Sequence, residues 1–170
     1  MNASNASDSL EDSLRQITQL LDKHRLVETM VHSRDSHRQA LIESLVRRQH
    51  LVALQIKLQR LHPADIAFIL ETLTPEYRLL VWEQVSLQRR GEVLLESSHG
   101  VREWLIETTA WDDLKDLLNY LDADELSDLA EDLPEDLLQE VSRSLSADER
   151  NRLHSSMAFA EDSVGHLMDY

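Results

Sequence analysis

The sequence has no cysteine, few aromatic residues and no long apolar run. Its 170 residues include three glycines, three prolines, three Trp, three Tyr and two Phe. Without cysteine, disulfides, thiolate catalysis and the commonest structural zinc sites are excluded. No segment approaches the roughly 20 apolar residues of a membrane-spanning helix, and the polar start does not resemble a secretory signal. We therefore expect a soluble chain from a reducing compartment.

Motifs that would carry catalysis are missing too. There is no Gly-rich phosphate loop, no His-Glu-x-x-His pair and no Gly-x-Ser-x-Gly elbow. The eight histidines are scattered without the spacing of a zinc site. His62, just before Pro63, is expected to be solvated or bonded to the backbone. The sequence predicts a protein that is not an enzyme.

The formal charge of -15 is unevenly distributed. Residues 110–150 hold fourteen Asp and Glu against three basic residues, whereas residues 34–60 hold six basic residues against two acidic ones. Nucleic-acid binders neutralise phosphates with a basic face, so the acidic half argues against nucleic acid as a partner. Cations or basic surfaces fit better, although surface carboxylates also simply keep a helical protein soluble.

From Leu61 onward the chain repeats every twelve residues, with anchor positions at 61, 73, 85 and so on to 157. The position eight residues after each of the first eight anchors is always apolar: Ile69, Val81, Val93, Leu105, Leu117, Leu129, Val141 and Leu153. A unit of this length cannot bury its own apolar face, so neighbouring units must stack. Such stacks create extended binding surfaces.

Helix starts are marked just after the anchors. All three prolines fall one or two residues past an anchor, where the first turn of a helix tolerates the missing N–H. Candidate N-caps follow the anchors at Thr74, Ser86, Asp122 and Ser146, and the last two have capping-box spacing with Glu125 and Glu149. No segment alternates like a strand. We predict an all-α superhelical stack of short helices, each about ten residues long, whose hand the sequence leaves open.

The region before the repeat has a different pattern. Residues 1–8 are polar and expected to be disordered. Apolar spacing predicts a helix over Ser9–His24 and a long one over Ser36–Leu61, so residues 9–60 form a helical extension of a repeat domain at 61–157. Within the repeat, Trp82 is expected to pack in the core.

The acidic segment from Asp122 to Asp132 is the best candidate for specific chemistry. Asp124 and Asp128 are four residues apart, so they share one helical face and repel each other without a cation. Glu92 would approach them if stacking brings the corresponding helices together. Oxygen ligands favour Mg²⁺ or Ca²⁺. On spacing alone, ordinary solvated carboxylates are the more common explanation.

Two strings resemble a known family: Leu61-His-Pro-Ala-Asp-Ile-Ala and Glu161-Asp-Ser-Val-Gly-His-Leu-Met. They are similar to the cytosolic N domain of MgtE-type magnesium transporters. His166 and Asp169 depart from that pattern. The resemblance implies that residues 158–170 begin a linker into CBS domains of the same polypeptide, which are absent here. It also implies a membrane-spanning homodimer on whose cytoplasmic side the domain lies, in the bacterial inner membrane.

The resemblance further implies a regulatory role for Mg²⁺. The ion would bind weakly at Glu92, Asp124 and Asp128, bridge them to acidic residues of the CBS domains and favour the closed channel. The alternative is a protein-binding helical-repeat adaptor, similar to a flagellar-motor switch protein, with no role for metal.

Overall fold

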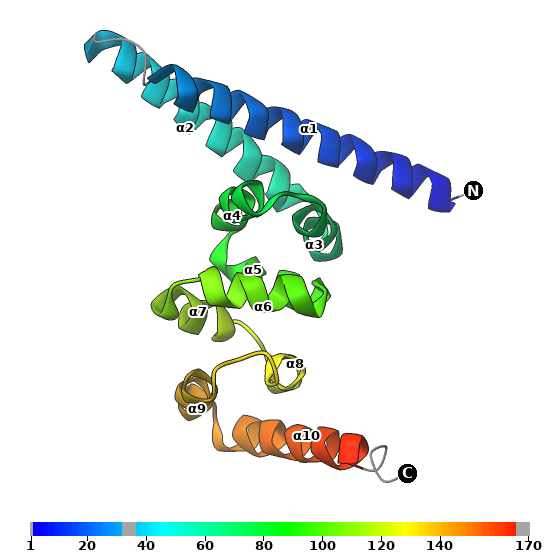
Figure 1. Cartoon of the computed structure of the whole chain (residues 1–170). Coiled ribbons are helices and arrows are strands. Elements are labelled where there is room, and N and C mark those ends of the chain that lie inside the picture. The colour runs from blue at the N-terminus through cyan, green and yellow to red at the C-terminus, as the bar shows by residue number, and fades with distance from the viewer. Residues whose placement is uncertain (1, 32–36, 166–170) are drawn as a thin grey trace. The chain divides into compact units, whose positions relative to one another are not determined.

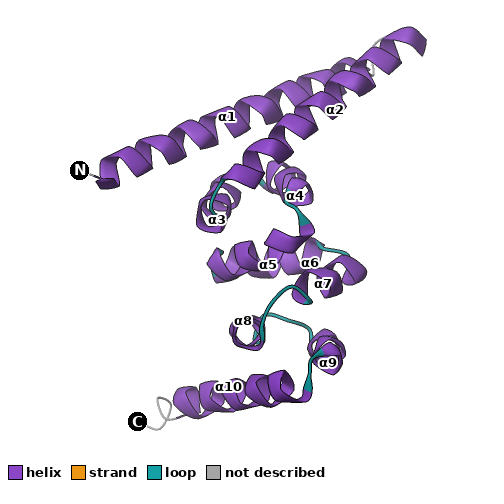
Figure 2. Ribbon diagram, turned by 180° about the vertical axis from the view of Figure 1, so that it is seen from behind, coloured by secondary structure: helices purple, strands orange, loops and turns teal. Residues whose placement is uncertain are grey.

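The computed structural model describes residues 2–31 and 37–165, and every regular element within them is an α-helix (Figure 1, Figure 2). The predicted all-α class is therefore confirmed for these residues. Contacts along the chain divide it into two compact units, Met1–Ser86 and Leu87–Tyr170. None of the described helices has the combination of length and hydropathy that a bilayer span requires.

The first unit contains α1 (Asn2–Val31), α2 (His37–Arg60), α3 (Pro63–Thr72) and α4 (Pro75–Gln84). The second unit contains α5 (Leu87–Glu96), α6 (His99–Thr108), α7 (Trp111–Leu118), α8 (Ala123–Leu129), α9 (Glu135–Ser144) and α10 (Ala147–Gly165). Each helix from α3 to α10 begins twelve residues after the start of the one before it. The repeat in the sequence is thus a repeat of helix starts.

One position in each repeat lies in the core. The seventh residue of every helix from α3 to α10 is the one that follows its anchor by eight positions, and its exposed fraction is at most 1%. These residues are Ile69, Val81, Val93, Leu105, Leu117, Leu129, Val141 and Leu153. Burial of an aliphatic side chain contributes about 1.5–3 kcal/mol, so this position is a main source of stability in each unit.

Two anchors are polar, and the structure accounts for both. The hydroxyl of Ser97, which is 3% exposed, donates to the carbonyl of Val93 at 2.7 Å. The hydroxyl of Thr109 donates to the carbonyl of Leu105 at 2.6 Å. A hydroxyl bonded to the carbonyl four residues earlier adds no unsatisfied polar group, so a polar residue replaces an aliphatic anchor at low cost.

The predicted start signals hold in part: Ser146 and Glu149 form reciprocal capping bonds, whereas Thr74 is the N-cap of α4 but its side chain makes no capping hydrogen bond. Pro63 and Pro75 occupy the first position of α3 and α4, whereas Pro134 lies one residue earlier, at the N-cap of α9. The Nδ1 atom of His62 accepts the N–H of Ala64 at 3.3 Å, which confirms the expected backbone-bonded imidazole. The prolines set φ near the helical value before the first turn forms.

Three arginines hold successive helices together. The fourth residue of a helix is an arginine in three cases, namely Arg78 in α4, Arg102 in α6 and Arg150 in α10. Each guanidinium donates to carbonyls at the end of the preceding helix. The Nε atoms bond to the carbonyls of Leu70, Leu94 and Ser142 at 2.8, 2.8 and 3.0 Å. The last carbonyls of a helix have no partner within that helix, so these partly buried arginines can satisfy them. In α8 the same position is Leu126, which is fully buried instead.

The ends of the chain differ from the sequence prediction. Helix α1 begins at Asn2 rather than Ser9 and continues to Val31, so residues 2–8, expected to be disordered, are helical. Extending an existing helix is far cheaper than nucleating one, so polar residues can join α1. Helix α10 continues to Gly165, so residues 158–165 are helical, and their assignment to a linker stays a prediction. Residues 166–170 lie outside the described part of the chain.

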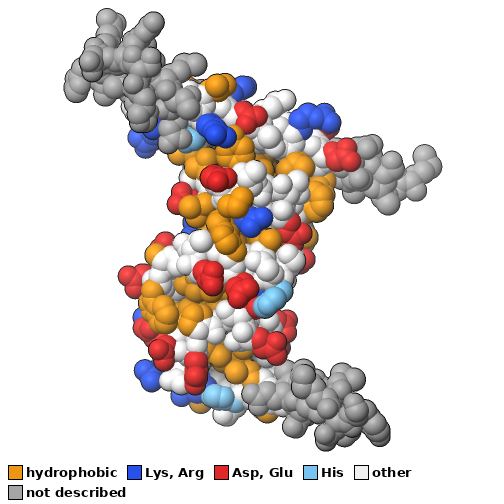
Figure 3. Space-filling view, viewed as in Figure 1, with side chains coloured by type: hydrophobic (Ala, Val, Ile, Leu, Met, Phe, Trp, Pro, Cys, Tyr) orange, Lys and Arg blue, Asp and Glu red, His pale blue; other side chains and the backbone are white. Residues whose placement is uncertain are grey.

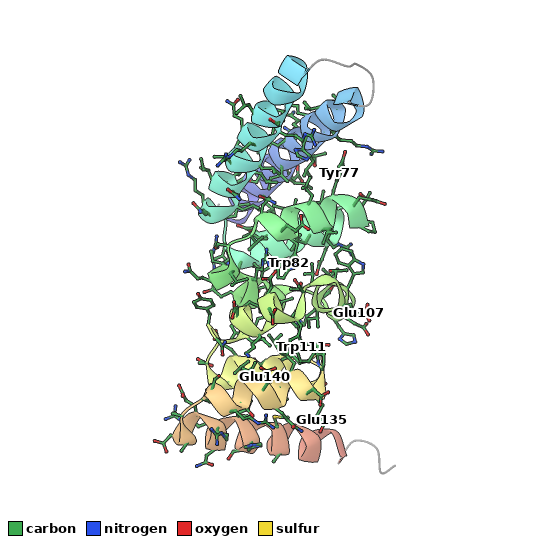
Figure 4. The ribbon with its side chains drawn as sticks, turned by 90° about the vertical axis from the view of Figure 1, so that its left-hand side faces the viewer. Tyr77, Trp82, Glu107, Trp111, Glu135 and Glu140 are labelled. Atoms are coloured by element: carbon green, nitrogen blue, oxygen red, sulfur yellow. The ribbon has the colours of Figure 1, made fainter. Side chains whose placement is uncertain are left out.

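The core of the first unit joins α1 and α2 to α4. Ile17 and Leu21 of α1 are fully buried, and Leu54 and Leu58 of α2 are each 2% exposed. Trp82 of α4 is also 2% exposed, so the predicted core role of this residue is confirmed (Figure 4). The long N-terminal helices therefore belong to the same compact unit as the first repeats.

Candidate functional site

Helix α8 is fixed at its start by a capping box. The Oδ1 atom of Asp122 accepts the N–H groups of Asp124 at 3.0 Å and Glu125 at 2.9 Å. In return, the N–H of Asp122 donates to the Oε2 atom of Glu125 at 2.9 Å. Two of the acidic side chains of this segment are thus structural, because they bond to N–H groups that the helix itself leaves unpaired.

The other two acidic side chains of α8 point to solvent. Ala123, Leu126 and Leu129 are at most 4% exposed and form the inner face, whereas Asp124 and Asp128 are exposed. Residues four apart on a helix have Cβ atoms about 5–6 Å apart. Neither aspartate forms an ion pair with a residue in the described part of the chain. The pair thus carries two neighbouring negative charges that no ion pair neutralises among the described residues.

Glu92 lies on a helix that packs against α8. It is exposed on α5, which contacts both α7 and α8. The preceding residue, Gly91, is buried, and a Cβ built on it would lie 2.6 Å from the Cδ2 atom of Leu121. Absence of a side chain at Gly91 therefore allows α5 to approach the segment that leads into α8.

These three carboxylates do not form a preformed metal cage. Across the described residues, no group of three or more His, Asp or Glu side chains is placed to hold a metal ion. A shallow depression of about 310 Å³ adjoins Asp124 and is lined by α10 residues that include Arg152 and Ser155. An open surface with oxygen ligands suits a weakly held, largely hydrated cation. The assignment of Glu92, Asp124 and Asp128 to a metal site stays a prediction.

A buried acidic group elsewhere in the second unit was not foreseen. The side chain of Asp132 is 5% exposed and its Oδ2 atom lies 2.9 Å from the Nη1 atom of Arg102. Its Oδ1 atom lies 2.6 Å from Nδ1 of the exposed His99, a pair that is ionic only when the imidazole is protonated. Arg78 and Arg102 are 24 residues apart, which is twice the repeat, so the sequence could have shown that they occupy equivalent positions. Nothing in the sequence pattern links Arg102 to Asp132.

Trp111, which the sequence did not explain, is 45% exposed at the start of α7. Its indole N–H lies 3.4 Å from Oε2 of Glu140 on α9, and Lys115 also bonds to Glu140 (Figure 4). The Lys115 ammonium, and next the Trp111 indole, hold the pKa of Glu140 below its ordinary value. The same bond raises the pKa of Lys115. This group connects α7 to α9 and requires no ligand.

The first unit has a larger hollow between α1 and α4. It has a volume of about 610 Å³ and is lined by Leu21, Tyr77, Leu80 and Glu83 among others. The hydroxyl of Tyr77, which lines the hollow, donates to Oδ1 of Asp22 on α1 at 2.8 Å. This bond ties α1 to the first repeats, so the hollow is explained by helix packing.

The comparison with protein families now identifies the repeat. A family model described as the MgtE intracellular N domain matches residues 61–162. The chain belongs to the MgtE family. A search of curated proteins finds no match to this chain.

The matched region coincides with the periodic part of this MgtE-family chain. It begins at Leu61, two residues before α3, and ends inside α10. Helices α1 and α2 precede it. Glu92, Asp124 and Asp128 all fall within the matched residues, and Figure 3 shows acidic side chains, in red, distributed over the surface of the second unit. The family places the domain in a magnesium transporter, on the intracellular side.

Proposed function

We propose that this chain is a regulatory, non-enzymatic domain that senses Mg²⁺ for a magnesium transporter. The observation that carries the proposal is the exposed pair Asp124 and Asp128 on α8, within a domain of the MgtE family. The inner face and the cap of α8 have structural partners, whereas this pair has no basic partner among the described residues.

The physical basis is repulsion between carboxylate surfaces. Asp124 and Asp128, with Glu92 on the adjoining helix, would be brought close to acidic residues of CBS domains in the same polypeptide. Bringing like charges together is unfavourable unless a cation lies between them. Mg²⁺ binds through one or two carboxylates while keeping several waters, so a site shared between two surfaces suits it.

Such a site converts ion concentration into a conformational equilibrium. A ligand shifts an equilibrium only by the difference in its affinity for the two states. Mg²⁺ that is held by two surfaces in a closed state, but by one surface in an open state, has that difference. Abundant Mg²⁺ would therefore favour the closed transporter, which functions as a homodimer in the membrane, and scarce Mg²⁺ would release it.

The isolated chain offers a direct test of its half of the site. With Mn²⁺ as a paramagnetic substitute for Mg²⁺, the amide signals of α8 around Asp124 and Asp128 should broaden first in an NMR titration. Excess Mg²⁺ should reverse the effect. The double variant Asp124→Asn, Asp128→Asn should abolish this selective broadening, because it removes both charges while keeping the size of the side chains.

The matched control is Asp112→Asn with Asp116→Asn, an exposed pair with the same spacing on α7. It removes the same charge and should leave the broadening at α8 unchanged. Equal broadening at α7 and α8, or an equal response of the two double variants, would mean a diffuse counterion effect and would refute the local site.

A further inference from the structure

Helix α2, which precedes the repeat, carries a cluster of basic residues. Over residues 44–60 it contains Arg47, Arg48, Lys57 and Arg60 and no Asp or Glu, in a chain of formal charge -15. This segment lies outside the matched MgtE domain. Its charge therefore needs an explanation separate from the proposed cation site.

The inner face of α2 is set by its contacts with α1 and α4. Leu54 and Leu58 are 2% exposed. On one side of them the Gln55 amide donates to Oε1 of Gln84 on α4 at 2.9 Å. On the other side the Lys57 ammonium donates to Oε1 of Gln16 on α1 at 2.6 Å. Helices α1 and α4 thus contact the side of α2 that carries Leu54 and Leu58, and the opposite face points away from these contacts.

The outer face carries three exposed aliphatic side chains, with the exposed Gln49 between the first and the second of them. Leu45, Val52 and Ile56 are 65%, 45% and 47% exposed, and their spacings of seven and four residues place them in one row. We call these three residues the outer row. Arg48 and Arg60 are exposed and border it, since Arg48 is three residues after Leu45 and Arg60 is four residues after Ile56. Aliphatic side chains flanked by arginines form a basic amphipathic surface.

We propose that the outer face of α2 binds the surface of an anionic phospholipid membrane. The outer row would enter the boundary between headgroups and acyl chains, while Arg48 and Arg60 would pair with lipid phosphates, as in interfacial amphipathic helices. The strongly acidic remainder of the chain is repelled by the same surface. Attraction at α2 would thus act against the repulsion of the rest of the chain, so that binding depends on this one face.

A second copy of the chain is a poorer occupant. Two outer faces packed together would bring Arg48 and Arg60 of one copy near the same residues of the other, with no carboxylate on residues 44–60 to neutralise them. Like charges at such short range are destabilising. A lipid surface supplies both the apolar layer and the negative charge.

Sedimentation with lipid vesicles tests the proposal. The whole chain is mixed with phosphatidylcholine vesicles that do or do not contain phosphatidylglycerol. Binding is expected only to the anionic vesicles and should weaken as salt is raised. The variants Leu45→Gln, Val52→Gln, Ile56→Gln combined, and Arg48→Gln, Arg60→Gln combined, should each lower the partition coefficient on the order of tenfold.

Two matched controls separate this surface from general properties of the chain. Phe68→Gln removes an apolar side chain of similar exposure, 46%, from α3, and should leave binding unchanged. Arg143→Gln with Arg152→Gln removes the same charge from exposed positions of the second unit and should also have no effect. All the substituted residues are exposed, so circular dichroism should show folded protein throughout.

Four results would overturn the proposal. The first is absence of binding to phosphatidylglycerol vesicles. The second is an equal loss in the arginine variants of α2 and of the second unit. The third is a wild-type dimer that the outer-row variant abolishes, since the face would then bind a second copy. Binding of soluble polyglutamate but not vesicles would likewise assign the face to an acidic polypeptide. None of these outcomes bears on the Mg²⁺ proposal, because they concern a different helix.

Discussion

In helices α3–α10 one position in every twelve is at most 1% exposed, whereas α2 leaves Leu45, Val52 and Ile56 between 45% and 65% exposed. The two regions also differ in length. Helices α3–α9 have seven to ten residues each, but α1 has 30 and α2 has 24. Isolated helices shorter than about 12–15 residues are marginal in water. The short helices therefore depend on burial and caps, while the long pair can leave one face unused.

In both regions, the residues that stabilise the fold differ from the residues that are exposed for binding. In the repeat, the inner positions and helix ends are committed to packing, so only outward residues such as Asp124 and Asp128 are available for a ligand. In α2, Leu54 and Leu58 pack in the core, and the opposite face of the helix stays exposed. We infer that each region recognises its partner with the side that its packing leaves exposed.

The largest effect should come from the buried position of the repeat. Leu105→Ala, at a fully buried site on α6, is expected to lower the free energy of unfolding of the second unit by about 2–5 kcal/mol. The physical cause is lost apolar burial together with the cavity that remains. Urea titration followed by circular dichroism would measure it.

The matched change in the other region is Leu45→Ala, at 65% exposure on α2. It should alter the free energy of unfolding of the first unit by no more than about 0.5 kcal/mol. If Leu45→Ala costs as much as Leu105→Ala, the outer row is part of a core and the contrast between the two regions is lost.

The sequence predicted the periodic part of this fold well because the signals are local. The buried position recurs in every helix from α3 to α10, and prolines or caps mark several of the helix starts, so the period located the starts of these helices. The period of buried positions also predicts that Asp124 and Asp128 lie on the side of α8 away from the core. The capping box of Asp122 and Glu125 was predicted for the same reason.

Contacts between distant residues could not be predicted. Arg102 and Asp132 are 30 residues apart, and Trp111 and Glu140 are 29 residues apart. Neither spacing is a multiple of the twelve-residue period, so the repeat does not relate these side chains. The relation of Glu92 to α8 likewise depends on how closely α5 packs, which Gly91 allows. The helical start of α1 was missed because composition describes residues 1–8 in isolation, not as the extension of a helix.

Two glycines of the repeat, Gly91 and Gly100, differ in how closely their surroundings are packed. A Cβ at Gly91 would lie 2.6 Å from Cδ2 and 2.9 Å from Cγ of Leu121, whereas one at Gly100 would have no neighbour within 4 Å. Both residues are helical. Gly91→Ala is therefore expected to destabilise the second unit by about 1–3 kcal/mol through overpacking, less the gain in helix propensity.

Gly100→Ala is the control, because it has the propensity gain without the clash. It should stabilise the second unit by up to about 1 kcal/mol. Thermal melts of the two variants would give shifts of opposite sign. A destabilised Gly100→Ala protein, or an unaffected Gly91→Ala protein, would contradict close packing of α5 against Leu121.

The smallest effect concerns the surface contacts between α7 and α9. Because Lys115 and Trp111 hold the pKa of Glu140 below its ordinary value of 4.5, the folded state is stabilised when Glu140 is ionised. That contribution is fully present above the pKa of the unfolded chain. It is lost as the pH falls below about 4.5 and through the lower pKa of the folded state.

Glu140→Gln should therefore lower the melting temperature slightly at pH 7, and its difference from the wild type should shrink as the pH falls from 5 to 3. The effect is small because the ion pair is open to solvent and screened by salt. Glu131→Gln, an exposed change on the same unit, should show no such convergence. If both variants follow the wild type in parallel at every pH, the Glu140 contacts add nothing to the stability of the repeat.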